Sequence, residues 1–576
     1  MNHRIPTFAS CTLLALGAAA FTFDDIHFWA GEGTSKCAVV IDWGARGPAL
    51  AWGYRWKGVG TNVAEVVRRI VHEDPRLVSD GAGTMFGYDV NDRHASFDKS
   101  AGTSGDPAAY AAANGSAGAW RLFGPFASAD FPTTAQAAAT ASADRIVPAA
   151  NQWFALRFTP QTSGPERIAA PAFAESPYGY EVVDSSTLEK SPLYNRAANV
   201  LGAPARGIFS ASAQYDDTGS VIHPAYPAWG GGLLFSLIGD EDWEEPGYVT
   251  IKVDHDVVDD PKNPFGIDFL VFGNSFAVKQ GTSYVTLGGD PSQVRFTGQG
   301  SAEGALVEVS QDGETWYAFE DGPYADDAMP TLGYLYDPEH ADAGLFGGNA
   351  YWGLPAHATR PLDPSRGFGD FAGMTLAQAC RAYNGSAGGT GFDLGELWDL
   401  PENADGRKWI RYVRISCLYS EEPNEDGDFG YTMPEVDAVA DVAPASDYEL
   451  WAQRYYSDWT TAWRDGTADA LAENGLPNAL CFAWGLAPWS SAGEDVPLRI
   501  DAFTPGEDVH ILTVKSPVRM QDAGGIVVRA TSSLSGGWMD VVPALVSSER
   551  MGGAYVNTFA VPASAGAFLK LAVPTE

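Results

Sequence analysis

The stretch from Pro261 to Asn274, with sequence PKNPFGIDFLVFGN, constrains the fold more than any other part of the chain. Its proline and asparagine residues predict a turn, and the apolar run that follows predicts a buried β-strand ending at a small-residue corner. Short alternating runs recur between turn residues along the whole chain, which contains 64 glycines and 37 prolines. This pattern favours a mainly β, multi-domain protein built from sandwiches over helical or doubly wound folds.

Four segments follow from these patterns. Residues 1–20 combine a basic start, an apolar run and small residues before position 21, which predict a signal peptide and an exported protein. The apolar run is shorter than the roughly 20 residues that a membrane-spanning helix needs, so we expect no transmembrane segment. We further expect an N-terminal α+β module with a loop-rich insertion over 21–175, a central β-sandwich over 176–443, and a C-terminal helix with a small β-sandwich over 446–576.

The N-terminal module is expected to open with two strands and a helix. Residues 37–43 and 49–56 have the composition of strands, and residues 61–73 place apolar side chains from Val63 to Val71 at helical spacing. The sequence therefore predicts a ββα opening.

Two local signals stand out in the later regions. Asp312-Gly313 lies between two apolar runs and predicts a hairpin over residues 304–319. Ser446 and Glu449 have the spacing of a capping box, which predicts a helix over 447–464. Short strands are expected after it, over residues 509–514, 525–530 and 568–573.

The charge and the cysteine content limit the function. The formal net charge is -37, and a field of this sign repels nucleic acid, which excludes phosphate-backbone binding as a main role. Beyond residue 20 the cysteines are Cys37, Cys380, Cys417 and Cys481, too few for a disulfide framework. A Cys380–Cys417 bridge and buried free thiols are both open interpretations.

Four motifs occur in a fixed order between residues 190 and 443. They are LGAP at 201–204, GIDFLVFGN at 266–274, VEVSQDGETWY at 307–317 and PEVDAVADV at 434–442. In this order they resemble a module of secreted bacterial surface proteins. The resemblance implies a non-catalytic, jelly-roll-like β-sandwich in the bacterial periplasm, at the cell surface or outside the cell, and some similar proteins accompany corrinoid uptake systems.

The two ends of the chain carry weaker likenesses. Residues 23–56 are similar to an N-terminal module of the same class of surface proteins. The corner GLPNALCFAWGLAP at 475–488 and the strand AFLKLAV at 567–573 resemble a C-terminal appendage of such proteins. Appendages of this kind often carry an acidic repeat, which is reduced here to three acidic residues over 464–474, and this argues against a metal in that region.

Acidic residues flank the stretch over 261–274, and others lie far downstream in the motif over 434–442. Calcium takes six to eight oxygen ligands, mostly from carboxylates and carbonyls, and clustered acidic side chains can supply them. Two interpretations are open, a solvated acidic surface or a calcium site. The candidate ligands of the calcium site are Asp254, Asp256, Asp259, Asn424, Asp426, Asp428, Glu435 and Asp437.

Alternation over residues 50–56 places Trp52, Tyr54 and Trp56 on one face of a strand. Three rings in a row form either part of a core or an exposed surface on which a sugar ring or a corrin stacks. His255, between two aspartates, is interpreted as a surface histidine, because neighbours on a strand point away from one another unless a bulge intervenes.

Catalytic motifs give no support for a common enzyme. The chain has no G-x-S-x-G elbow, no phosphate-binding loop and no H-E-x-x-H zinc motif. The leading hypothesis is an exported, non-catalytic protein that binds a corrinoid or a carbohydrate, with calcium stabilising its loops and envelope proteins as candidate partners. The alternatives are a glycoside hydrolase or polysaccharide lyase, whose paired carboxylates a sequence cannot reveal, and a structural surface-layer or adhesion component.

Overall fold

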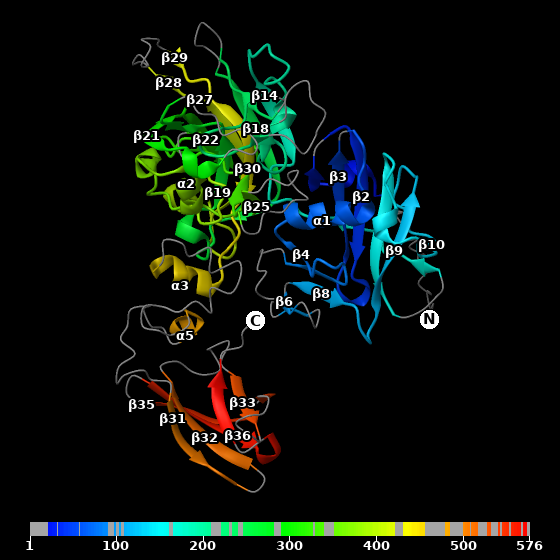
Figure 1. The fold of residues 1–576 in the computed structure, drawn as a ribbon. Helices are drawn as coiled ribbons and strands as arrows, with labels where there is room; N and C mark the ends of the chain where they lie inside the picture. The colour runs from blue at the N-terminus through cyan, green and yellow to red at the C-terminus, as the bar shows by residue number, and fades with distance from the viewer. Residues whose placement is uncertain are drawn as a thin grey trace, which may run out of the picture. The chain divides into compact units, whose positions relative to one another are not determined.

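The computed structural model describes most of the chain from residue 21 to residue 572 (Figure 1). The segments outside the described residues within that span are 32, 57, 90–96, 99–102, 105–108, 161–164, 209–219, 230–232, 240–245, 282–289, 327–328, 339–350, 421–429, 456–477, 484–498, 507–508, 517–526, 532–538, 542–543, 552–553 and 566–567. The expected signal peptide over 1–20 and the acidic loop over 421–428 therefore lie outside the described residues.

The fold is mainly β and divides into two compact units. The described residues within 1–71, 79–86 and 110–174 form the first unit, and those within 72–78, 87–109 and 175–576 form the second. Among the described residues, no helix is both long enough and apolar enough to span a bilayer.

A mixed sheet with strand order β1-β3-β2-β11-β9 is the centre of the first unit, and β13 pairs with β3. The predicted ββα opening is confirmed, because β2 and β3 pair antiparallel over their full lengths and α1 follows them. The elements here are β1 (Trp29–Gly31), β2 (Ser35–Asp42), β3 (Ala49–Trp56), α1 (Val63–Glu73), β5 (Met85–Tyr88), β8 (Tyr110–Ala113), β9 (Ala119–Phe126), β10 (Ala135–Gln136), β11 (Gln152–Thr159), β12 (Glu166–Arg167) and β13 (Ala172–Phe173). Between α1 and β8 the chain also forms β4 (Leu77–Ser79), β6 (Phe97–Asp98) and β7 (Thr103–Ser104).

Two antiparallel sheets form the central sandwich of the second unit (Figure 1). The five-stranded sheet has the order β14 (Glu181–Ser186), β18 (Tyr248–Val258), β27 (Trp409–Cys417), β22 (Ala305–Ser310) and β23 (Tyr317–Ala318). The four-stranded sheet has the order β17 (Phe235–Ser236), β30 (Glu435–Asp441), β19 (Phe269–Gly273) and β26 (Thr390–Phe392). Strands far apart in sequence are neighbours in both sheets, which gives the sandwich its jelly-roll-like topology.

One apolar core joins the two sheets. Ile251 and Ile415 from the five-stranded sheet and Phe269 and Val439 from the four-stranded sheet belong to the same buried cluster. Phe269 stacks on Phe392 of β26 with ring centroids 4.9 Å apart. The buried strand predicted within residues 261–274 is therefore β19, a central strand of the smaller sheet.

Connections between the sandwich strands carry short secondary elements. The predicted hairpin is confirmed, because β22 pairs antiparallel with β23 around Asp312-Gly313. The other elements of these connections are β15 (Gly207–Ile208), β16 (Ser220–Val221), β20 (Phe276–Lys279), β21 (Phe296–Ser301), β24 (Tyr334–Tyr336), β25 (Trp352–Pro355), α2 (Leu376–Ala382), β28 (Tyr419–Ser420) and β29 (Gly430–Tyr431).

The C-terminal region has its own helices and sheets. Helix α3 (Asp447–Tyr455) begins at the predicted capping box, in which Ser446 Oγ accepts from the Glu449 amide and the Glu449 carboxylate accepts from the Ser446 amide. The second half of the predicted helix lies outside the described residues. Helix α5 (Asn478–Ala483) precedes a sheet of β31 (Arg499–Thr504), β32 (Val509–Ser516), β36 (Ala554–Pro562) and β35 (Ala544–Met551) and a sheet of β34 (Met539–Val541), β33 (Val527–Thr531) and β37 (Phe568–Ala572).

The four described cysteines are all buried, and Cys380 and Cys417 are free thiols, so the bridge between them is not formed. Burial raises the pKa of the Cys417 thiol to about 11, which keeps it protonated and unreactive at neutral pH.

Candidate functional site

Two of the three aromatic side chains predicted to bind a ligand belong to the core. Trp52 is fully buried and Tyr54 is 3% exposed, and Trp52 makes an edge contact with Trp43 at 6.4 Å between centroids. Trp56, at the end of β3, is partly exposed and stacks on Tyr54 at 6.0 Å. These rings pack against one another inside the first unit, so they do not form an exposed stacking surface.

The five predicted metal ligands that the structure describes do not converge on one site. Asp254 and Asp256 lie in β18 beside a pocket, Asp259 joins two other aspartates, and Glu435 and Asp437 lie in β30. Asp437 is buried and accepts a hydrogen bond from the Ala205 amide at 2.8 Å. Asn424, Asp426 and Asp428 lie outside the described residues.

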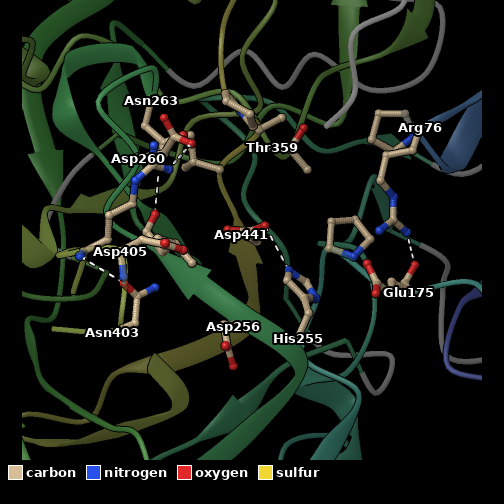
Figure 2. A pocket seen from close by; sticks show the side chains of 17 residues that line it. Arg76, Glu175, His255, Asp256, Asp260, Asn263, Thr359, Asn403, Asp405 and Asp441 are labelled. Atoms are coloured by element: carbon tan, nitrogen blue, oxygen red, sulfur yellow. Dashed lines mark hydrogen bonds and ion pairs between the residues drawn. The ribbon is translucent and has the colours of Figure 1, made fainter. Parts of the chain in front are cut away.

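The second unit contains a polar pocket of about 680 Å³ (Figure 2). It is formed where β18 and β30 end, together with the loop that follows β26. Its lining is charged or amide-bearing at ten positions and otherwise consists of Thr359, small apolar residues and prolines. The lining residues are Pro75, Arg76, Glu175, Pro177, His255, Asp256, Val258, Asp260, Asn263, Thr359, Asn403, Asp405, Arg407, Asp441, Val442, Ala443 and Pro444.

His255 in this pocket bridges two carboxylates. Its Nδ1 lies 2.7 Å from Asp254 Oδ1. Its Nε2 lies 3.0 Å from Asp441 Oδ2 (Figure 2). The pairing of β18 with β27 is irregular between Lys252 and Val257, and this bulge allows adjacent residues of one strand to contact each other. His255 is therefore not the surface histidine that a regular strand would have produced.

The surroundings of His255 keep it charged. Burial disfavours the imidazolium, but hydrogen bonds to Asp254 and Asp441 and the charges of both carboxylates raise the pKa of His255 to about 10. Asp254 also accepts a hydrogen bond from the Ser176 amide at 2.8 Å. At neutral pH the histidine is a cation between two anions.

Arg76 adds a second buried cation to the pocket wall. Its side chain is 4% exposed, and its Nε lies 3.0 Å from Asp74 Oδ1. Burial opposes its charge, but Asp74 raises the pKa of Arg76, and the charge of Asp254 contributes in the same direction. Arg76 also donates to the backbone carbonyl of Glu175.

Two further arginines pair with acidic side chains of the pocket. Arg407 Nη1 lies 2.8 Å from Asp260 Oδ2, and Arg411 Nε lies 2.6 Å from Asp256 Oδ1. Asn403 Oδ1 accepts from the amides of Asp405 and Arg407, which shapes the loop that presents these residues. These two arginines therefore offset part of the negative charge of the pocket wall.

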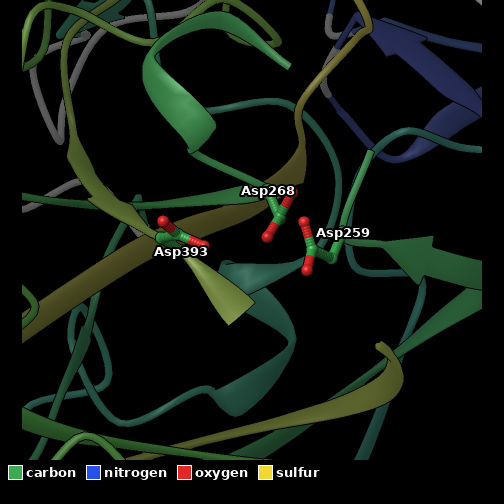
Figure 3. Close-up of side chains that lie close together, drawn as sticks. All are labelled: Asp259, Asp268 and Asp393. Carbon is green, nitrogen blue, oxygen red and sulfur yellow. The ribbon is translucent and has the colours of Figure 1, made fainter. Parts of the chain in front are cut away.

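Close to this pocket three carboxylates face one another (Figure 3). Asp259, Asp268 and Asp393 offer oxygen atoms that all lie within 4.8 Å of one another, and we call these residues the acidic triad. Asp259 follows β18, Asp268 precedes β19, and Asp393 follows β26.

Backbone hydrogen bonds explain why these three positions meet. The amide of Asp259 donates to the carbonyl of Lys408 at 3.0 Å, and the amide of Asp268 donates to the carbonyl of Phe392 at 2.8 Å. The turn from Pro261 to Gly266 thus begins beside β27 and ends beside β26.

The triad carries a large electrostatic penalty. Burial raises the pKa of Asp268 to about 8; hydrogen bonds from Asn263 and the Leu394 amide lower it, and the charges of Asp259 and Asp393 raise it. Burial also raises the pKa of Asp393, although the Gly395 amide and Lys408 oppose this effect.

Glu435, at the other end of β30, lies in a separate acidic cluster. Burial, together with the charge of Glu303, raises the pKa of Glu435 to about 7. Asp326 nearby is 4% exposed and its pKa is raised well above the usual value by burial, with Glu435 and Glu303 contributing. Ser275 donates its amide to Asp326 Oδ1 at 2.7 Å.

Sequence reasoning missed Asp268 and Asp393 as site residues. Asp268 lies inside the stretch over 261–274 and was interpreted only as part of a strand. An aspartate at the start of an apolar strand was a signal that could have marked it as a site residue. Asp393 caps a short 3-10 turn, with Gly395 donating its amide to Oδ1 at 2.6 Å, and nothing in its local sequence connects it to Asp268.

Comparison with known proteins adds no assignment. No family model matches the chain, and no curated protein matches it. The functional argument therefore depends on the pocket and the triad themselves.

Proposed function

We propose that this protein is an exported, non-catalytic binding protein whose polar pocket takes a neutral carbohydrate. The composition of the pocket wall carries the proposal. Carboxylates, asparagine amides and arginines surround a space of about 680 Å³, and such groups offer the mixed donors and acceptors that sugar hydroxyls require. Bacterial export remains an expectation from the N-terminal pattern and from the resemblance described above.

The same wall disfavours the other ligand class expected from the sequence. A corrin ring presents a wide, largely apolar face, and binding it calls for aromatic or large aliphatic side chains. None of the lining residues is a phenylalanine, tyrosine or tryptophan. Because the formal net charge is -37, an acidic glycan would also be repelled, so a neutral sugar fits best.

The charges in the pocket also favour binding over catalysis. A general base needs a pKa near the working pH, whereas His255 in the pocket, with a pKa of about 10, keeps its proton at neutral pH. Glu435 and Asp268, with pKa values of about 7 and about 8, do not line the pocket. Asp256, Asp260 and Asp441 each pair with a cationic side chain.

The test is titration calorimetry of the purified protein with a panel of neutral oligosaccharides, acidic oligosaccharides and cobalamin. We expect saturable binding of a neutral oligosaccharide that is recovered intact. The Asp405→Ala variant should bind at least roughly tenfold more weakly, because a hydrogen bond to a charged group contributes about 1.5–3 kcal/mol. Asp399→Ala, an exposed change on the same loop but outside the pocket wall, is the control.

Three results would count against the proposal. Equal affinity of Asp405→Ala and the unmodified protein would place the ligand elsewhere. Recovery of cleaved oligosaccharide would favour the glycosidase or lyase alternative. Self-association without affinity for any compound of the panel would favour a structural surface component.

A further inference from the structure

We propose that the acidic triad, together with the amide oxygen of Asn263, binds a calcium ion. The calcium proposal does not rest on the carbohydrate proposal, although Asn263 also lines the pocket. It differs from the calcium site expected from the sequence, because of the five predicted ligands that the structure describes only Asp259 belongs to it.

The spacing of the triad suits a single ion. Calcium is bound by oxygen atoms at roughly 2.3–2.6 Å, so ligand atoms on opposite sides of the ion are separated by about twice that distance. The triad oxygens lie within 4.8 Å of one another, which allows all three to reach one common point. Figure 3 shows the three carboxylates turned toward the space between them.

An orphaned buried oxygen provides an independent reason. Asn263 is 4% exposed, and its Nδ2 donates to Asp268 Oδ1 at 2.8 Å. Its Oδ1 is buried and has no hydrogen-bond partner. A buried amide oxygen without a partner costs roughly 1–3 kcal/mol, so this atom points to a ligand that supplies a positive charge or a donor.

The charges around the triad also favour a bound divalent cation. Lys408 is the cation that acts on Asp393, but its Nζ also donates to the carbonyl of Gly395 at 2.8 Å. The neighbouring Arg407 pairs with Asp260 and not with the triad. A divalent cation would offset the repulsion between the three carboxylates.

The ligand types favour calcium over other divalent ions. All four groups offer hard oxygen atoms, which excludes a preference for zinc or copper. The turn from Pro261 to Gly266 contains Phe265 and Gly266 in the left-handed region, with φ of 61° and 76°, and is an irregular loop. Calcium accepts irregular coordination with waters completing the shell, whereas magnesium demands a near-ideal octahedron.

The experiment is calcium titration of the chelator-treated full chain, followed by calorimetry and by thermal unfolding. With calcium at 100 times its Kd, we expect the melting temperature of the second unit to rise by roughly 3–5 °C. Asp393→Asn should weaken calcium binding at least roughly tenfold, because it removes one charged ligand. Asp399→Asn, an exposed aspartate six positions further on, should bind like the unmodified protein.

A second readout separates ion binding from a purely structural role. In chelator, Asp393→Asn relieves repulsion within the triad, so its melting temperature should equal or exceed that of the unmodified protein. In calcium the order should reverse. If Asp393→Asn does not fold, Asp259→Asn answers the same question.

Two outcomes would overturn the proposal. One is the absence of any calcium-dependent heat or melting shift in the unmodified protein. The other is an unchanged calcium affinity in Asp393→Asn or Asp259→Asn, which would place the bound ion at another acidic region.

Discussion

At the scale of a single residue, His255 shows how a buried charge depends on its neighbours. Its folded pKa is about 10 against an ordinary value of 6.5, so the contribution of its charge to stability is fully present below pH 6.5 and is lost as the pH rises through 10. The groups that face it are Asp254 and Asp441, and the charge of Arg76 also acts on Asp254.

We predict that His255→Ala lowers the free energy of unfolding by roughly 3 kcal/mol at pH 6, because two buried or half-buried carboxylates lose their cation. The difference from the unmodified protein should shrink as the pH rises from 6.5 to 10. Urea unfolding at several pH values measures this. An equal loss at pH 6 and pH 10 would mean that the histidine acts through packing alone.

Gly273, at the end of β19, gives a second residue-scale prediction. A Cβ at this position would lie 2.3 Å from Asp326 Oδ1 and 2.7 Å from the Glu435 carbonyl oxygen. Gly273→Ala should therefore destabilise the protein by roughly 1–3 kcal/mol, the usual cost of overpacking. Gly369→Ala, where a Cβ would meet no atom within 4 Å, is the matched control for chemical denaturation. Similar unfolding midpoints for the two variants would contradict this account.

At the scale of elements, the sequence predicted those features that depend on nearby residues. The apolar face of α1, the hairpin around Asp312-Gly313 and the N-terminal cap of α3 each depend on residues that are only a few positions apart in sequence. The burial of β3 did not follow in the same way. Alternation placed Trp52 and Tyr54 on one face, but the sheet and the layers against it bury both faces from Ala49 to Tyr54.

The candidate sites required long-range information. Asp268 and Asp393 are 125 positions apart in sequence, and they meet because β19 and β26 are neighbours in the four-stranded sheet. His255 contacts Asp254 only because β18 bulges opposite Arg411. Strand order and bulges are properties of the assembled sheets, and no local pattern in one sequence encodes them.

The loop from Asp393 to Lys408 provides the element-scale prediction. It begins at the triad, ends beside the pocket residue Arg407, and carries Trp398, whose side chain is 88% exposed. If the pocket binds a carbohydrate, an exposed indole on the same loop is suited to stacking on a sugar face.

We predict that Trp398→Ala weakens binding of the oligosaccharide roughly tenfold, as expected for an aromatic anchor. Its melting temperature should stay nearly unchanged, because the ring makes little contact with the fold. Titration calorimetry and thermal unfolding measure the two effects, with Asp399→Ala as the neighbouring control. Unaltered affinity would remove this ring from the binding surface.

At the scale of the whole molecule, the division into two compact units separates two effects of calcium. One is screening of the formal net charge of -37, and the other is binding at the triad. Ions that merely screen the charge of the chain should stabilise both units, since acidic residues occur throughout. An ion bound at the triad should stabilise only the second unit, because Asp259, Asp268 and Asp393 all belong to it.

We therefore predict two calorimetric unfolding transitions, and calcium should raise the melting temperature of only one of them. The transition of the first unit can be marked with Val40→Ala, because Val40 is fully buried in that unit's core and the change should cost roughly 1–3 kcal/mol. Val40→Ala should leave the melting temperature of the second unit unchanged. Calcium should raise that melting temperature, and magnesium at equal concentration should raise it less. A uniform rise of both transitions, equal for the two ions, would reduce the effect of calcium to screening and would contradict a specific site at the triad.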